Sequence, residues 1–106
     1  MWIALNTGFL SIVELKGDPA RLLVRARRRI DLERILGKDV VIEEMPERDY
    51  RWRTVTSREG LKTLLSAAVD AITYTNFKDS TKDRDLHDLY LDMWHAHHRY
   101  QQRDRL

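Results

Sequence analysis

The segment from residue 21 to residue 27 constrains the fold most, because its side chains alternate in the pattern of a half-buried β-strand. One side of the segment is apolar and the other carries arginine: Leu22, Val24 and Ala26 against Leu23, Arg25 and Arg27. Successive side chains of a strand point to opposite faces of a sheet. The chain therefore needs a sheet with one face in the core and one face that carries arginine.

Four further segments favour β-strands, because they are rich in bulky and β-branched residues and lie between residues typical of turns. They cover residues 2–5, 9–15, 40–45 and 50–55. Asn6, Thr7 and Gly8 separate the first two segments, and residues 46–49 separate the last two. We expect a strand pair, or one bulged strand, at the N-terminus and an antiparallel hairpin near the middle of the chain.

Two segments in the first three quarters of the chain favour helices. Asp31 can cap a short helix that runs to Leu36 and ends at Gly37. Thr56 and Glu59 have the spacing of a capping box. The apolar residues that follow this box recur at helical spacing: Leu61, Leu64, Leu65, Ala68 and Ile72.

A last helix is expected after the loop at residues 74–77, with Asp79 or Ser80 as its cap. Phe77 is placed to pack against this helix as a hydrophobic staple. One side of the helix carries the residues expected to be buried: Leu86, Leu89, Tyr90, Met93, Trp94 and His97. Residues 101–106 are polar, and we expect them to fray.

The order of these elements predicts an α+β fold. We expect a small antiparallel sheet with helices on one face, ferredoxin-like or a permuted variant, plus a C-terminal helix. At 106 residues the chain has a size typical of one domain, so residues 1–106 are expected to form a single domain.

Composition argues against several classes of protein. There is no cysteine, so disulfides, thiolate nucleophiles and cysteine-bound zinc are excluded. The four glycines are scattered and no serine lies in a glycine elbow, so a phosphate-binding loop and a serine hydrolase are disfavoured. No signal peptide and no membrane-spanning run is visible. We expect a cytoplasmic protein without enzymatic activity, cofactor or membrane partner.

Arginine supplies the best candidate binding surface. The most basic segment covers residues 21–29, and the set expected to share the open sheet face is Arg25, Arg27, Arg51 and Arg53. Such a guanidinium patch can hold an acidic protein surface, a protein–nucleic acid complex or RNA. The alternative is that nearby carboxylates neutralise it, from Glu43, Glu44, Glu47 and Asp49. Tyr50 and Trp52 have the opposite parity and are expected in the core.

The last third of the chain supplies a second set of candidates. Four basic residues can project toward a partner from the loop and first turns of the last helix: Lys78, Lys82, Arg84 and His87. Caps and staples explain most of the surrounding residues equally well. Asp88, Asp92 and His95 fall on one helical stripe, but their spacing is not that of a catalytic metal helix, so we expect no metal site.

The chain resembles a family of short uncharacterised bacterial and phage-associated proteins. The resemblance rests on MWIALN at residues 1–6, FLSIV at 9–13, LLVRAR at 22–27, NFK at 76–78 and LHDLY at 86–90. It implies no activity and no site residue. We expect a non-enzymatic protein that occupies a surface of a macromolecular partner, in the manner of a phage-type inhibitor such as an anti-CRISPR protein. An RNA or single-stranded nucleic-acid binding module is the alternative, and a metal-dependent hydrolase is the least favoured hypothesis.

Overall fold

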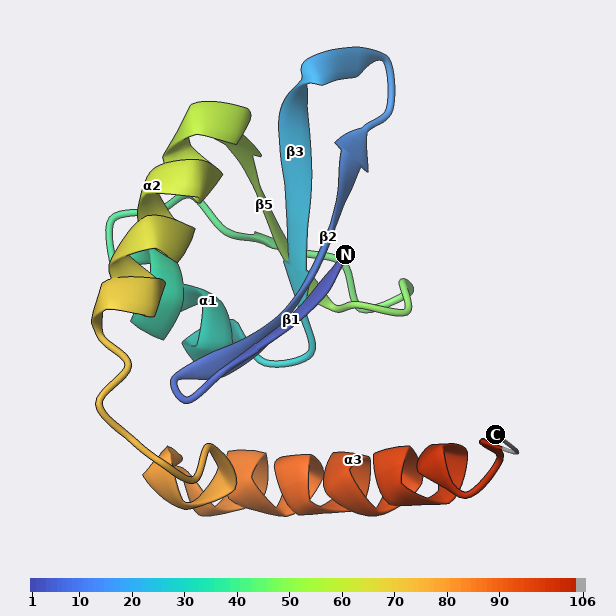
Figure 1. The fold of residues 1–106 in the computed structure, drawn as a ribbon. Helices are drawn as coiled ribbons and strands as arrows, with labels where there is room; N and C mark the ends of the chain where they lie inside the picture. The colour runs from blue at the N-terminus through green and yellow to red at the C-terminus, as the bar shows by residue number, and fades with distance from the viewer. Residues whose placement is uncertain (105–106) are drawn as a thin grey trace. The chain divides into compact units, whose positions relative to one another are not determined.

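The computed structural model describes residues 1–104, which divide into two compact units. The N-terminal unit, residues 1–73, holds a sheet and two helices, and the C-terminal unit begins at Tyr74 and holds one short and one long helix (Figure 1). The single domain expected from the sequence stays a prediction. None of the helices among the described residues is long and apolar enough to cross a membrane.

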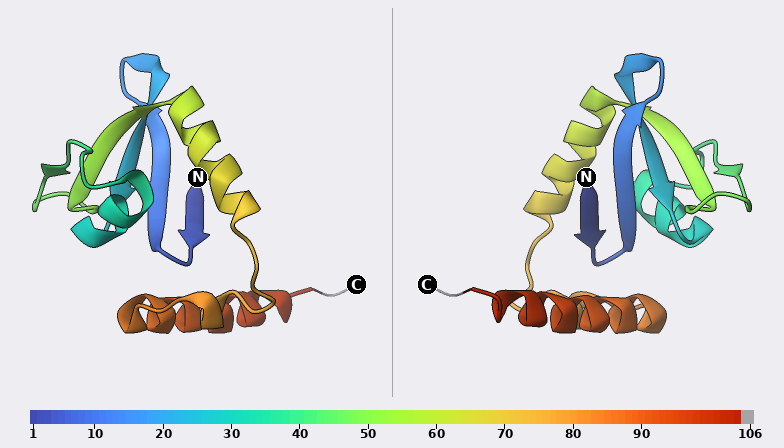
Figure 2. Two further views of the ribbon diagram at one scale, coloured as in Figure 1. Left: turned by 90° about the vertical axis from the view of Figure 1, so that its left-hand side faces the viewer. Right: turned by 90° about the vertical axis from the view of Figure 1, so that its right-hand side faces the viewer.

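The sheet has five strands in the order β1-β2-β3-β5-β4, with every neighbouring pair antiparallel. The strands are β1 (Trp2–Leu5), β2 (Gly8–Leu15), β3 (Asp18–Ala26), β4 (Glu43–Glu44) and β5 (Trp52–Ser57). The first three form a meander, and β5 returns along the free side of β3, as both views of Figure 2 show. The α+β class and the antiparallel sheet predicted from the sequence are confirmed.

The predicted strand at residues 40–45 is reduced to the two residues of β4. Val41 has no apolar surface to cover it and is 86% exposed. Its carbonyl oxygen accepts a hydrogen bond from the Thr54 hydroxyl at 2.6 Å, which takes the place of ladder pairing at this point. The hairpin to β5 is nevertheless formed, with Glu43 opposite Arg53.

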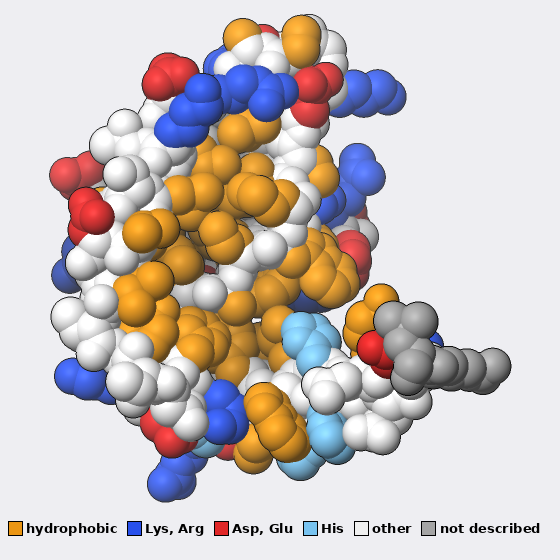
Figure 3. Space-filling view, viewed as in Figure 1, with side chains coloured by type: hydrophobic (Ala, Val, Ile, Leu, Met, Phe, Trp, Pro, Cys, Tyr) orange, Lys and Arg blue, Asp and Glu red, His pale blue; other side chains and the backbone are white. Residues whose placement is uncertain are grey.

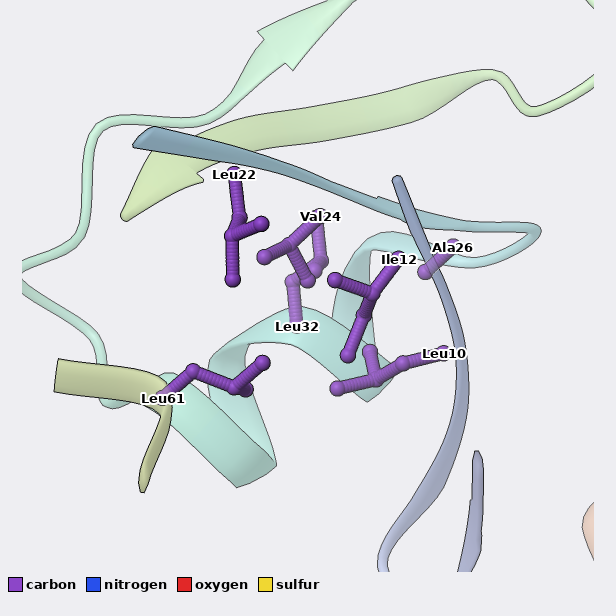
Figure 4. Packing of buried hydrophobic residues seen from close by; sticks show 7 residues of the cluster. All are labelled: Leu10, Ile12, Leu22, Val24, Ala26, Leu32 and Leu61. Carbon is purple, nitrogen blue, oxygen red and sulfur yellow. The ribbon is translucent and has the colours of Figure 1, made fainter. Parts of the chain in front are cut away.

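Helices α1 (Arg29–Leu36) and α2 (Arg58–Asp70) lie on the same face of the sheet (Figure 1). The core between them and the sheet is formed by seven buried residues, Leu10, Ile12, Leu22, Val24, Ala26, Leu32 and Leu61 (Figure 4). Ile12 and Val24 are cross-strand partners, so β2 and β3 place their even-numbered residues on the same side. The alternation predicted for residues 21–27 is therefore confirmed.

Two of the predicted helix caps in the N-terminal unit are wrong. Ser57, not Thr56, caps α2, since its Oγ accepts a hydrogen bond from the Gly60 N–H at 2.9 Å. Asp31 does not cap α1, which starts two residues earlier. Its buried carboxylate instead accepts a hydrogen bond from the Phe9 N–H at 3.3 Å and thus ties α1 to β2. Burial raises the pKa of Asp31.

In the C-terminal unit a short helix, η1 (Lys78–Ser80), precedes α3 (Arg84–Gln101). The cap predicted at Asp79 or Ser80 is wrong, because those residues belong to η1. Asp83 caps α3, and its Oδ1 accepts hydrogen bonds from the Asp85 and Leu86 N–H groups. The fraying predicted for residues 101–106 falls in part on residues 105–106, which lie outside the described residues.

The apolar side of α3 is narrower than predicted. Leu86 and Tyr90 are buried, and the Phe77 ring lies 5.0 Å from the Tyr90 ring, so Phe77 packs against this helix as predicted. It does so from its position before η1, and not from the position next to the Asp83 cap that a hydrophobic staple occupies. Leu89, Trp94 and His97 are exposed, contrary to the prediction. Trp94 stacks on a neighbouring imidazole of the same helix, His98, at 5.4 Å, which covers one face of its ring.

Candidate functional site

The register between β3 and β5 places Arg25 directly opposite Arg53. Their chain neighbours Val24 and Thr54 are buried on the side of the helices, so both arginines lie on the other face of the sheet. We call this surface the arginine face. Around the pair it includes Ser11, Val13, Leu23, Arg25, Arg53 and Val55, and Glu43 of β4 lies on it opposite Arg53. Strand pairing thus places two arginines on directly opposed positions of one face.

Each of these arginines is held in place by one terminal nitrogen. Arg25 Nη2 donates to Ser11 Oγ at 2.7 Å, and Arg53 Nη2 donates to the Tyr50 carbonyl oxygen at 3.3 Å. The guanidinium carbon of Arg25 also lies 4.8 Å from the centre of the Tyr50 ring, within the range of a cation–π interaction. The side chains are therefore ordered before any partner arrives.

Neither Arg25 nor Arg53 has a carboxylate partner within residues 1–104. The Nε atom of each is buried and makes no hydrogen bond, and these are the two buried side-chain nitrogen or oxygen atoms of the described chain that lack a partner. Buried donors without partners and like charges on opposed residues both cost free energy. The pair is therefore a site of positive charge that no ion pair neutralises, although Glu43 of β4 stands directly opposite Arg53 on the same face.

The other two predicted arginines are neutralised by carboxylates. Arg27 Nη1 donates to Asp49 Oδ1 at 2.9 Å and to the Asp49 carbonyl oxygen at 2.7 Å. The hydrogen bond that Arg27 donates to the Asp49 carboxylate raises the pKa of Arg27 above its ordinary value. Arg51 Nε donates to Glu44 Oε2 at 2.7 Å. Neutralisation by nearby carboxylates, the alternative raised by the sequence, thus applies to Arg27 and Arg51. Arg25 and Arg53 form no such ion pair within the described residues.

Tyr50 is buried and Trp52 is partly buried, as predicted for core residues, but the two rings pack against different partners. Trp52 packs against the core cluster. Tyr50 is buried, but its ring lies beneath Arg25 and Arg27, with its centre 4.2 Å from the guanidinium carbon of Arg27. Tyr50 precedes the first residue of β5, so the alternation of the strand does not extend to it.

Sequence reasoning also missed Ser11 and Trp2. Ser11 lies in an apolar run and is 1% exposed. Its position in the alternation of β2 could have placed it on the same face as the arginines, because it pairs with Arg25. Trp2 is paired with Ser11, which puts its 71% exposed side chain on the same face of the sheet.

The four basic residues predicted in the last third of the chain all belong to the C-terminal unit. Lys78 Nζ lies 3.5 Å from Asn76 Oδ1, and His87 Nε2 lies 3.5 Å from Asp79 Oδ1. Lys82 and Arg84 are exposed and form no ion pair within the described residues. These residues lie along η1, the segment that follows it and the first turns of α3.

Within the described range, no three histidine, aspartate or glutamate side chains converge as a metal site would require. Asp88, Asp92 and His95 are exposed along α3.

Comparison with protein-family models, with curated proteins and with solved structures finds no match to this chain.

Proposed function

We propose that this chain is a non-enzymatic binding protein that occupies an anionic surface of a macromolecular partner, as a phage-type inhibitor does. The contact is made by Arg25 and Arg53 on the arginine face. The observation that carries the proposal is that neither arginine of this pair forms an ion pair within residues 1–104, although Arg27 and Arg51 nearby each form one.

An anion at the pair offsets the repulsion between the two directly opposed arginines. Carboxylate and phosphate oxygens accept hydrogen bonds from guanidinium N–H groups in planar, often bidentate geometry. Because Ser11 and the Tyr50 carbonyl already hold one end of each side chain, little rotamer freedom is lost on binding. The site is therefore pre-organised for an oxyanion.

The surroundings of the pair favour an acidic protein surface. Val13 and Val55 are partly exposed beside the arginines, and Leu23 lies half-buried between these two valines. Apolar side chains around a central arginine are typical of the energetically dominant part of a protein interface. The partner thus presents a carboxylate within an apolar surround.

RNA or single-stranded nucleic acid is the second candidate, and the observation in its favour is Trp2. Its exposed indole lies on the arginine face, where it offers a stacking surface for a base. We place this candidate second because affinity for nucleic acid depends on many phosphate contacts, and Arg27 and Arg51 are already neutralised.

The first test uses inorganic phosphate and acetate as probes, with arginine Nε–H resonances as the readout. At constant ionic strength, the resonances of Arg25 and Arg53 should shift along a saturable curve, while those of Arg27 and Arg51 stay in place. Equal and unsaturable shifts of all four would show that the pair is no more than an ordinary charged surface.

The second test identifies the class of partner. The full chain and an Arg25→Met/Arg53→Met variant are used to capture partners from a cell lysate, with Arg51→Met as the matched control. Capture that survives nuclease treatment and is lost only in the double variant supports a protein partner. If nuclease treatment abolishes capture, the partner is RNA. Equal capture by all three chains refutes the role of the pair.

A further inference from the structure

The two edges of the sheet are built differently. At one edge β4 consists of two glutamates, Glu43 and Glu44, whose charge opposes pairing with another strand. At the other edge β1 lies in a stretch, residues 1–13, that contains no charged side chain and no proline. Natural edge strands are usually protected by such residues, so β1 lacks the protection that β4 has.

The backbone of β1 offers hydrogen-bonding groups at this open edge. The Ile12 N–H donates to the Met1 carbonyl at 2.8 Å, and the Met1 nitrogen donates to the Ile12 carbonyl at 2.7 Å. Hydrogen-bonded pairs alternate along an antiparallel ladder, so Ile3 also faces β2. The N–H and C=O groups of Trp2 and Ala4 therefore point away from β2, toward the side where the sheet has no further strand.

We infer that β1 pairs with β1 of a second copy of this chain in an antiparallel, two-fold symmetric dimer. With the axis at Ile3, Trp2 of each copy stands opposite Ala4 of the other. All N–H and C=O groups that β1 directs outward at these two positions are then paired across the axis. The strand is complementary to itself in this register, and its lack of charge removes any repulsion between the copies.

Apolar surface flanks the open edge on both sides of the sheet. On the arginine face, the Trp2 side chain is 71% exposed. On the helix face there is a groove of about 500 Å³ beside α2, where Figure 3 shows hydrophobic side chains gathered at the surface. Its apolar lining includes Met1, Ile12, Leu61 and Leu65. A dimer that covers both surfaces gains the hydrophobic stabilisation that backbone pairing alone does not supply.

The symmetry fixes where the helices of the two copies lie. A two-fold axis perpendicular to the sheet places the α2 helices of both copies on the same face. The extended sheet then carries the helices of two chains on one face, whereas a short peptide would add none.

Dimerisation extends the sheet without touching the anion site. The arginine faces of both copies become one surface, and their β3 strands are separated by five strand spacings, or about 24 Å. The inference stands independently of the proposed function. If both hold, the dimer presents two equivalent anion sites to one partner, which raises its avidity.

The test is sedimentation equilibrium of the full chain over a wide range of concentration. We expect a dimer for the wild type and monomers for Ala4→Pro and Trp2→Lys, with dissociation constants raised at least about tenfold. Ala4→Pro removes an N–H that the β1–β2 ladder does not use, and Trp2→Lys adds charge without altering the backbone. Val41→Lys is the matched control for Trp2→Lys, because it adds the same charge at an exposed residue away from β1.

A wild type that stays monomeric at every concentration would overturn the inference. So would an Ala4→Pro or Trp2→Lys variant that dimerises normally, or a Val41→Lys variant that dissociates equally. Hydrogen exchange gives an independent readout, because the Trp2 and Ala4 amides should be protected in the dimer and lose that protection on dilution. Unprotected amides in a proven dimer would assign the interface to another surface and refute pairing through β1.

Discussion

Replacing Arg53 with methionine should stabilise the protein, although it removes a charged side chain and a hydrogen bond. Methionine retains most of the apolar stem and deletes the buried Nε that has no partner. It also removes the like charge opposite Arg25. If the arginine pair is kept for binding, it lowers the stability of the fold. A neutral residue in place of one arginine should then raise the stability.

The magnitude follows from four contributions. Relief of an unsatisfied buried donor stabilises by about 1–3 kcal/mol. Removal of the like charge opposite Arg25 and loss of the opposite charge across from Glu43 each amount to about 0.2–1 kcal/mol and roughly cancel. Loss of the long hydrogen bond to the Tyr50 carbonyl costs about 0.5–1.5 kcal/mol. We expect the free energy of unfolding to rise by about 1 kcal/mol, which raises Tm by roughly 4–8 °C for a unit of this size.

Urea and thermal unfolding of the wild type and Arg53→Met measure this directly, with Arg51→Met as the control. Arg51 forms an ion pair with Glu44 while 53% of its side chain is exposed, so its replacement should change stability by no more than about 0.5 kcal/mol. If Arg53→Met proves less stable than Arg51→Met, the arginine pair is a structural feature and our account of it is mistaken.

Three further predictions concern the framework that holds the site. Gly8→Ala should destabilise by about 1–3 kcal/mol in urea unfolding, because the new Cβ would lie 2.8 Å from Asp31 Cβ and 3.0 Å from its Cα; an unchanged midpoint would argue against this close approach. Burial raises the pKa of Asp31, so the folded protein holds its proton more tightly than the unfolded chain, and stability should fall as pH rises from 3.8 to the raised value. Asp31→Asn should remove this part of the pH profile, and identical profiles would contradict it. Ser57→Ala should cost about 1 kcal/mol by removing the cap of α2, measured by thermal unfolding against the exposed control Ser66→Ala.

Sequence reasoning succeeded where structure depends on local periodicity. The alternation of residues 21–27 predicted both the buried side and the arginine side of β3, because burial of one face imposes a period of two on any strand. It failed where the outcome depends on the end of an element. Caps moved by one or more residues at Ser57 and Asp83, since neighbouring polar residues compete for the same N–H groups.

The candidate site could be predicted only in part, because its charge balance is set by long-range pairing. Parity placed Arg25 and Arg53 on one face, but only the β3–β5 register shows that they stand directly opposite one another. Similarly, Asp49 meets Arg27 because of the path that the chain takes before β5. A list of arginines and carboxylates along the sequence does not show which charges remain unpaired.

The meander of β1, β2 and β3 has a consequence for the order of folding. Two-residue connections join these strands, so their pairing needs only short loops to close, whereas β5 must reach β3 across α1 and the hairpin. We expect β1–β3 to form early and β5 to dock late. The arginine pair straddles that last junction, so an anion bound there would hold β5 in place and slow unfolding.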